Sequence, residues 1–145
     1  MKSALITFNS KKGKTLEYAK DIARFLESHN ISSRIVSVAD CEDHHFKGAD
    51  MVFFGCWTSG LMIIAQRPEK RWVDFAKKTP AIHDKKIVLF TTYLIATGSM
   101  FKSMQKHLNG KITDVSLKLK SRQPVMTDIN KAQLEDFLKS LSEKS

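Results

Sequence analysis

Cysteine is scarce in this chain of 145 residues, which contains only Cys41 and Cys56. Two cysteines cannot form the set of disulfides that holds a small secreted domain together, so we expect a reducing, cytoplasmic location. Long apolar runs are missing as well, since none approaches the roughly 18 residues that a membrane-spanning helix needs. The apolar stretch after Lys2 is too short for a signal peptide. We therefore expect neither a disulfide scaffold nor a membrane span.

Proline and glycine are also few, with three and six residues. The chain has no linker rich in these residues, no low-complexity tract and no internal repeat. Its 42% hydrophobic and 27% charged residues are the balance of a globular protein, which excludes the disordered and collagen-like classes. A chain of this length is expected to be one domain, which we assign to residues 1–145.

Acidic residues are outnumbered: 15 Asp and Glu face 24 Lys and Arg, which gives a net charge of +9. The surplus is spread along the chain and not gathered in one run, and between residues 100 and 124 Asp114 is the only acidic residue. Such an excess favours anionic partners, which include nucleic acid, a phosphate cofactor, an acidic protein and a membrane surface. Nucleic acid is disfavoured, because the aromatic residues lie in predicted strands or on inward helix faces instead of among exposed cations.

Hydrophobic patterning predicts an alternation of strands and helices. Short apolar runs predict buried strands at 3–8, 34–38, 50–55 and 86–91, and weaker alternation predicts a fifth at 112–119. Apolar residues at three- and four-residue spacing predict helices at 14–29, 99–108 and 129–141. A further helix is expected to open at Pro68, and Asp128 is expected to cap the last helix.

This order of elements predicts the α/β class, with a doubly wound five-stranded parallel sheet that carries helices on both faces. Ligands of such sheets bind beyond the carboxyl ends of the strands. Function is therefore expected in three loops, at 9–15, 56–67 and 92–98. None of the three contains a carboxylate.

The first loop has the residue types that hold a phosphate monoester. It reads Asn9-Ser10-Lys11-Lys12-Gly13-Lys14-Thr15. The amides that begin a helix and the helix dipole favour an anion here, while Ser10 and Thr15 add hydroxyls and Gly13 permits close approach. Neither the G-x-x-x-x-G-K nor the G-x-G-x-x-G signature is present. A capped, solvated, lysine-rich turn is the alternative interpretation.

At this loop the chain resembles the flavodoxins, whose signature is [ST]-x-T-G-x-T between the first strand and the first helix. The matching residues are Ser10, Gly13 and Thr15, and Lys12 departs by standing where the family has threonine. The resemblance extends over the whole chain in element order and length. It implies that Ser10, Lys11, Lys12, Gly13, Lys14 and Thr15 bind the phosphate of FMN.

The resemblance also assigns the other two loops to the flavin ring. In the second loop it implies FMN contacts from Trp57, Thr58, Ser59 and Gly60, with Trp57 against one ring face and Gly60 permitting a peptide flip. In the third loop it implies contacts from Thr92, Tyr93, Leu94, Thr97 and Gly98, with Tyr93 against the opposite face. Both aromatic residues also fit an ordinary place in the core.

Two other segments contain residue types that could form a site. The apolar segment Leu61-Met62-Ile63-Ile64-Ala65 either packs down against the sheet or forms a patch for a partner. The cluster Cys41-Glu42-Asp43-His44-His45 has no second group of ligands to complete a metal site, so no metal is expected. The acidic pair that a response regulator needs after the first strand is absent.

The resemblance thus predicts an FMN-binding electron carrier more than a stand-alone enzyme, with a redox partner that has an acidic docking face. Two alternatives stay open. One is an FMN-dependent oxidoreductase that acts on a quinone- or porphyrin-type substrate. The other is a flavodoxin-like binding module that has lost FMN.

Overall fold

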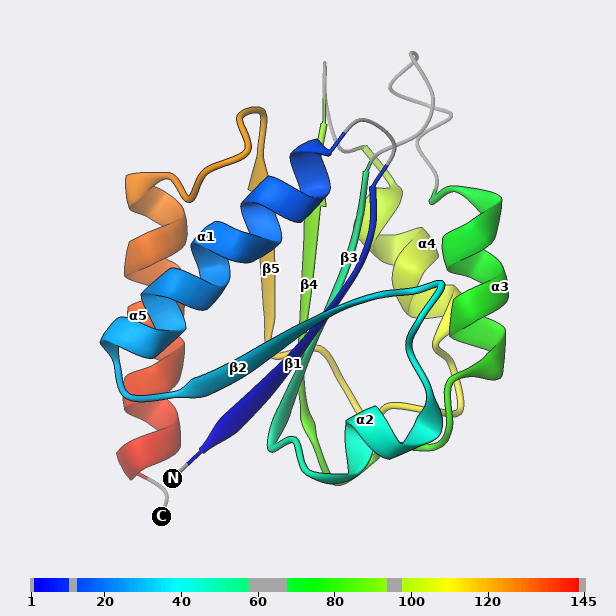
Figure 1. The fold of residues 1–145 in the computed structure, drawn as a ribbon, viewed down its shortest axis with the longest axis horizontal. Coiled ribbons are helices and arrows are strands. Elements are labelled where there is room, and N and C mark those ends of the chain that lie inside the picture. Colours follow the sequence, from blue (N-terminus) through cyan, green and yellow to red (C-terminus); the bar gives the residue numbers. More distant parts are fainter. Residues whose placement is uncertain (1, 11–12, 58–67, 94–97, 144–145) are drawn as a thin grey trace.

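Five parallel strands form the centre of the molecule (Figure 1). The computed structural model describes residues 2–10, 13–57, 68–93 and 98–143. The strands are β1 (Ser3–Asn9), β2 (Ser32–Ser37), β3 (Met51–Trp57), β4 (Lys86–Thr92) and β5 (Leu117–Ser121). Their order in the sheet is β2-β1-β3-β4-β5, and every pairing is parallel. The predicted doubly wound sheet is confirmed.

Helices cover both faces of this sheet (Figure 1). They are α1 (Lys14–Ser28), α2 (Asp43–Lys47), α3 (Lys70–Lys78), α4 (Met100–His107) and α5 (Asp128–Glu143). One core lies between the sheet and the pair α1 and α5, and a second lies between the sheet and α2, α3 and α4. Successive side chains of β3 point alternately into the two cores, with Phe53 in the first and Phe54 in the second. This double burial explains the apolar runs of the central strands.

A glycine in β3 makes room for an aromatic ring of the first core. A Cβ atom on Gly55 would lie 2.0 Å from the ring of Phe90 on β4. That ring packs edge-on against Tyr18 of α1, with ring centroids 5.7 Å apart. The hydroxyl of Tyr18 donates to Oδ1 of Asn130 on α5 over 2.6 Å. A continuous buried contact therefore runs from the sheet through α1 to α5.

Several predicted boundaries were wrong, and each has a local cause. β5 begins at Leu117, because Ile112 and Val115 pack against the second core from an irregular segment. The helix expected to open at Pro68 begins at Lys70, after an extended Glu69. Asp128 is not the cap of the last helix but its first residue.

Thr127 caps the last helix instead. Its hydroxyl accepts the amide N–H of Asn130 over 3.0 Å, and the Asn130 side-chain carbonyl accepts the Thr127 N–H over 3.2 Å. This reciprocal pair is a capping box in which asparagine replaces the usual glutamate. Nearby, Asp21 of α1 accepts the N–H of Met126 over 2.6 Å, which ties the segment between β5 and α5 to α1.

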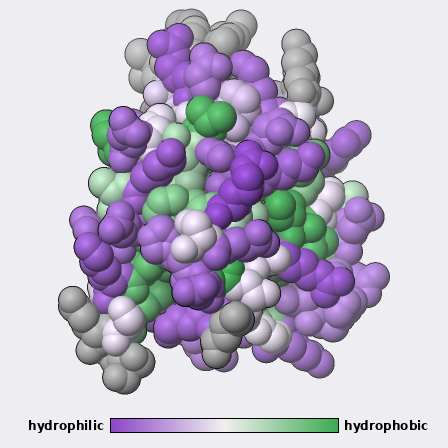
Figure 2. All heavy atoms as spheres, turned by 60° about the vertical axis from the view of Figure 1, so that its left-hand side comes forward, coloured by the Kyte–Doolittle hydropathy of each residue, from purple (hydrophilic) through white to green (hydrophobic). Residues whose placement is uncertain are grey.

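The surface is mostly polar. On the face shown in Figure 2, hydrophilic residues predominate and the hydrophobic areas are small and separated. The large apolar side chains reported as exposed among the described residues are Val125, at 49%, and Ile129, at 72%. Within the same described part of the chain, every helix is too short or too polar to span a bilayer.

Candidate functional site

Three chain segments leave the sheet side by side at its carboxyl edge, which is at the top of Figure 1. In the register of the strands, Asn9 of β1 lies opposite Cys56 of β3, and Trp57 of β3 lies opposite Thr92 of β4. The loops predicted to carry function therefore start at one level on three neighbouring strands. This is the place where parallel sheets of this kind bind ligands.

The first loop ends in a helix start that is open to a ligand. Gly13 is the N-cap of α1 with a left-handed φ of +85°, and no side chain of the described residues caps the helix. The N–H of Glu17 makes the first helical bond to the Gly13 carbonyl, so the amides between these residues have no acceptor within the helix. Lys14, the first helical residue, is exposed. The helix thus offers unpaired donors at a positively charged turn.

Ser10 adds a donor with no partner of its own. Its Oγ is buried, yet it makes no hydrogen bond in the described part of the chain. A buried hydroxyl without a partner is costly, and a phosphate oxygen would supply an acceptor. The uncapped helix start at Gly13 and the hydroxyl of Ser10 together fit the phosphate of FMN.

The first and third loops meet directly beneath the helix start. Oγ1 of Thr15 lies 3.0 Å from Oγ1 of Thr92, and both side chains are buried. Each hydroxyl can donate one hydrogen and accept two, so the pair keeps capacity for a further partner. The structure therefore joins two of the predicted site residues that are 77 positions apart in the chain.

A carboxylate that the sequence reasoning missed joins the first and second loops. Oε2 of Glu69, just before α3, accepts the indole N–H of Trp57 over 2.7 Å and the side-chain N–H of Asn9 over 2.9 Å. The Glu69 side chain is 31% exposed, and its other oxygen lies 4.0 Å from the Nε of Arg71. One carboxyl group thus fixes the ends of β1 and β3 against the start of α3.

Tyr93 follows β4 at the same edge. Its backbone N–H donates to the Ser121 carbonyl at the end of β5 over 3.3 Å. Its phenol lies near Tyr18, whose pKa is raised by burial, by Asp21 and by Tyr93 itself. Trp57 and Tyr93 are both partly exposed. They leave neighbouring strands one register position apart, which brings both predicted ring contacts to one site.

The remaining predicted contacts are only partly described. Gly98 precedes α4 with a positive φ of 49°, a conformation that suits glycine. The predicted contacts Lys11, Lys12, Thr58, Ser59, Gly60, Leu94 and Thr97 lie outside the described residues, as does the apolar segment 61–65. Their roles stay predictions.

Comparison with solved structures identifies the architecture. The two-electron-reduced flavodoxin of Megasphaera elsdenii superposes with a TM-score of 0.71 at 19% identity, over 90% of this chain and 94% of that one. The oxidised flavodoxin 2 of Bacillus cereus gives 0.71 at 16% identity, over 99% of both chains. The fold is that of the flavodoxins. No protein-family model matches the sequence, and no curated protein matches it.

The flavodoxin-like fold also occurs inside larger proteins. The rubredoxin oxygen:oxidoreductase of Desulfovibrio gigas superposes with a TM-score of 0.68 at 14% identity. The match covers 98% of this chain but only 35% of that protein. At these identities the similarity shows the fold, and the chemistry has to be argued from the residues at the carboxyl edge.

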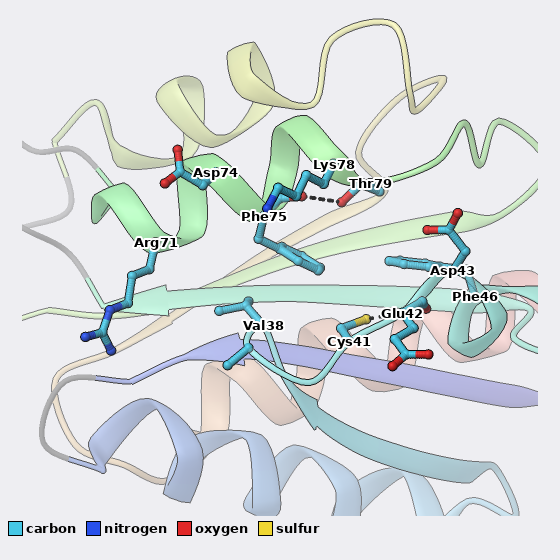
Figure 3. Close-up of a pocket in the computed structure, with 11 residues that line it drawn as sticks. Val38, Cys41, Glu42, Asp43, Phe46, Arg71, Asp74, Phe75, Lys78 and Thr79 are labelled. Carbon is cyan, nitrogen blue, oxygen red and sulfur yellow. Dashed lines mark hydrogen bonds between the residues drawn. The ribbon is translucent and has the colours of Figure 1, made fainter.

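A hollow of about 550 Å³ lies on the side of the flavodoxin-like sheet, between α3 and the segment before α2 (Figure 3). Phe75 and Val38 line it from opposite sides, with Cys41 and Phe46 further along. The buried polar atoms without partners in the described residues belong to Ser10, Ser33 and Trp72, and none of these lines the hollow. It lacks the unpaired donor found at the first loop, so the carboxyl edge remains the candidate site.

The acidic and histidine residues before and in α2 have a structural role. The N–H of Glu42 donates to Nδ1 of His45 over 2.9 Å, and the Glu42 side chain accepts the backbone N–H of His45 in return. This pair caps α2. No group of three potential metal ligands occurs within the described ranges.

The two thiols are held in their protonated form. Burial raises the pKa of Cys56 to about 12, and burial together with Asp43 and Glu42 raises the pKa of Cys41 to about 11. Because the thiolate is the reactive form, we expect the thiol reagent DTNB at pH 7.4 to modify Cys41 slowly. Cys56, fully buried, should react only after unfolding. A Cys41→Ala variant isolates Cys56, and rapid modification of its folded form would contradict this assignment.

Proposed function

We propose that this protein binds FMN at the carboxyl edge of its sheet and acts as an electron carrier. The observation that carries the proposal is the buried hydroxyl of Ser10, which has no partner among the described residues, three positions before a start of α1 that no described side chain caps. A phosphate monoester satisfies both sets of donors, and its charge is favoured by the helix dipole. The flavodoxin-like fold supports the same assignment, since its solved examples include oxidised and two-electron-reduced flavodoxins.

Different described residues would bind different parts of FMN. Ser10, Gly13 and Lys14 would bind the phosphate, while Thr15 and Thr92 would hold the loops above them together. Trp57 and Tyr93 would lie against the isoalloxazine ring, with Trp57 oriented by Glu69. The flavin supplies the redox chemistry, and the chain supplies binding, orientation and local charge.

Two other functions would use the same fold. An FMN-dependent oxidoreductase of a quinone- or porphyrin-type substrate would turn that substrate over with no second redox protein. A module that has lost FMN would fail to bind it. The unpartnered Ser10 hydroxyl favours a retained phosphate site over this last alternative.

Titration of the purified protein with FMN and with riboflavin tests the proposal. Riboflavin shares the ring and the ribityl chain but lacks the phosphate. We expect isothermal calorimetry to give one FMN per chain and at least about tenfold weaker riboflavin binding, because about 1.4 kcal/mol of binding free energy corresponds to a tenfold change in Kd. Equal affinities for FMN and riboflavin would show that the phosphate contributes nothing to binding. No binding of either flavin would refute the proposed function.

Replacing both ring contacts tests where the flavin ring lies. Stacking on Trp57 and Tyr93 is expected to quench most of the fluorescence of bound flavin. The double variant Trp57→Ala/Tyr93→Ala should therefore bind FMN more weakly and emit more strongly when saturated. Phe25→Ala is the control, because Phe25 is a partly buried aromatic residue of α1 that stacks on His29. Unaltered fluorescence and affinity in the double variant would place the ring elsewhere.

A further inference from the structure

The far edge of the sheet carries a row of cationic side chains. β5 is an edge strand, and its side chains alternate, with Leu119 buried in the core shared with α1 and α5. Lys118 and Lys120 therefore point to the other face of the sheet, and both are exposed. Arg122 follows just beyond the end of the strand and is also exposed. Residues two apart in a strand are about 7 Å apart, so these three charges form a closely spaced row.

Helix α4 packs on the same face of the sheet and also carries exposed cations. Its apolar residues Met100 and Met104 pack into the second core, while Lys102 and Lys106 are exposed. We call Lys102, Lys106, Lys118, Lys120 and Arg122 the basic surface. No described carboxylate forms an ion pair with any of these five side chains. Their charge is therefore not neutralised within the described part of the chain.

The histidine that ends α4 also lies near cations. The pKa of His107 is lowered by partial burial and by repulsion from Lys77 of α3 and Lys106 of the basic surface. Lys118 and Lys120 follow one another along β5 at about 7 Å, within the Debye length of about 8 Å at physiological salt, so their potentials add. This surface should attract acidic molecules.

Two exposed apolar side chains follow the row in the chain. Val125 lies three residues after Arg122 and Ile129 seven, and they are the exposed large apolar residues of the described part of the chain. Their segment is well ordered by its contacts: Ser121 Oγ donates to the Val125 carbonyl over 3.0 Å, and Asp21 accepts the N–H of Met126. The bond to Ser121 holds Val125 near the end of β5, and exposed apolar side chains near charged ones are typical of a protein interface.

We propose that the basic surface, together with Val125 and Ile129, is the docking site of an acidic redox protein. The proposal rests on the proposed function, since the Tyr93 N–H donates to the Ser121 carbonyl and so places Arg122 near Tyr93, one of the proposed ring contacts. A partner seated here would reach the flavin through the ends of β4 and β5. Among the described residues no aromatic side chain is exposed on this surface, which favours a protein over nucleic acid.

A matched pair of charge-reversal variants tests the proposal, with an oxidised plant-type [2Fe–2S] ferredoxin as the acidic probe. Lys118→Glu/Lys120→Glu reverses two charges of the basic surface. Lys47→Glu/Lys86→Glu reverses two exposed charges at the opposite end of the sheet and changes the net charge equally. We expect calorimetry at low salt to show at least tenfold weaker ferredoxin binding for the first variant and less than twofold for the second.

Further measurements separate the contribution of the charges to ferredoxin binding from that of the apolar side chains. Ferredoxin binding to the unaltered protein should weaken as salt rises, and Ile129→Ser should weaken it severalfold with the salt dependence unchanged. Equal losses in the two double variants, no ferredoxin binding at low salt, or tighter binding of a 20-base-pair DNA duplex would each overturn the proposal.

The titrations are run with and without FMN. Failure to bind FMN would refute the proposed function, while dependence of ferredoxin binding on Lys118 and Lys120 would still be measurable.

Discussion

Replacing Gly13 with valine should weaken FMN binding by about a hundredfold, equivalent to about 2.7 kcal/mol. Gly13 has a φ of +85° as the N-cap of α1, a conformation that costs a side chain with a Cβ atom about 1–2 kcal/mol. Apart from its chain neighbours, no described atom lies within 4 Å of the position that a Cβ would take. Valine would therefore strain the turn and project its methyl groups into the open space where the phosphate is expected.

Gly110 provides a matched control for this substitution. It has a φ of +83° and is likewise free of described neighbours around the Cβ position, but it follows α4 away from the carboxyl edge. Gly110→Val should lose a similar amount of unfolding free energy, about 1–2 kcal/mol, with its FMN affinity retained. Chemical denaturation and calorimetry on both variants separate strain from ligand binding. Equal loss of FMN affinity in the two variants would show that Gly13 has no direct part in the site.

The order of elements was predictable because buried parallel strands have a strong signal. Residues 50–55 and 86–91 are apolar on both faces, and the structure places β3 and β4 there. Helix α2 was not predicted, since a five-residue helix with one buried residue, Phe46, has no measurable period. The start of β5 at Leu117 could not be predicted either. Ile112 and Val115 are residue types typical of strands, but they pack against the second core from a loop.

The place of the candidate site was predicted from topology, but its internal contacts were not. The rule that ligands bind at the carboxyl ends of strands led to the loops that carry Ser10, Trp57 and Tyr93. Glu69 lies outside those loops, and its bonds to Asn9 and Trp57 span 60 and 12 positions in the chain. The sequence did contain a signal that an acceptor lies nearby, because the indole N–H of Trp57 and the side-chain amide N–H of Asn9 both need one at neighbouring strand ends. A single sequence does not show which carboxylate reaches them.

Glu69 changes the electrostatic expectation for the bound flavin. The three predicted loops contain lysine and arginine but no carboxylate, and this composition alone predicts a midpoint potential less negative than that of acidic flavodoxins. The structure adds a negative charge at the same edge, hydrogen-bonded to the side chain proposed to contact the ring. A nearby anion opposes the addition of electrons to the flavin. Glu69 is therefore expected to lower the potential that the surrounding cations raise.

Exchanging Glu69 for glutamine should raise the midpoint potential of bound FMN by tens of millivolts. Glutamine keeps a carbonyl oxygen that accepts the N–H groups of Trp57 and Asn9, so the variant removes the charge and retains an acceptor. A unit charge about 8 Å away at an effective dielectric constant near 20 contributes about 2 kcal/mol before screening. That energy corresponds to about 90 mV for a one-electron step, at about 59 mV for each tenfold change. Because the Glu69 side chain is 31% exposed, screening reduces this value.

Spectroelectrochemical titration at two salt concentrations measures this shift. Glu27→Gln is the control, since it removes an equal charge from an exposed position near the far end of α1. Its effect should be small at 0.15 M salt, where charges beyond about 8 Å are largely screened. Glu69→Leu separates charge from position, because it also removes the acceptor that Glu69 provides to Trp57 and Asn9, and losing the acceptor of a buried donor such as Asn9 costs about 1–3 kcal/mol of stability. If Glu69→Gln left the potential unchanged while Glu69→Leu altered Trp57 fluorescence and stability, Glu69 would act by positioning Trp57 and not through its charge.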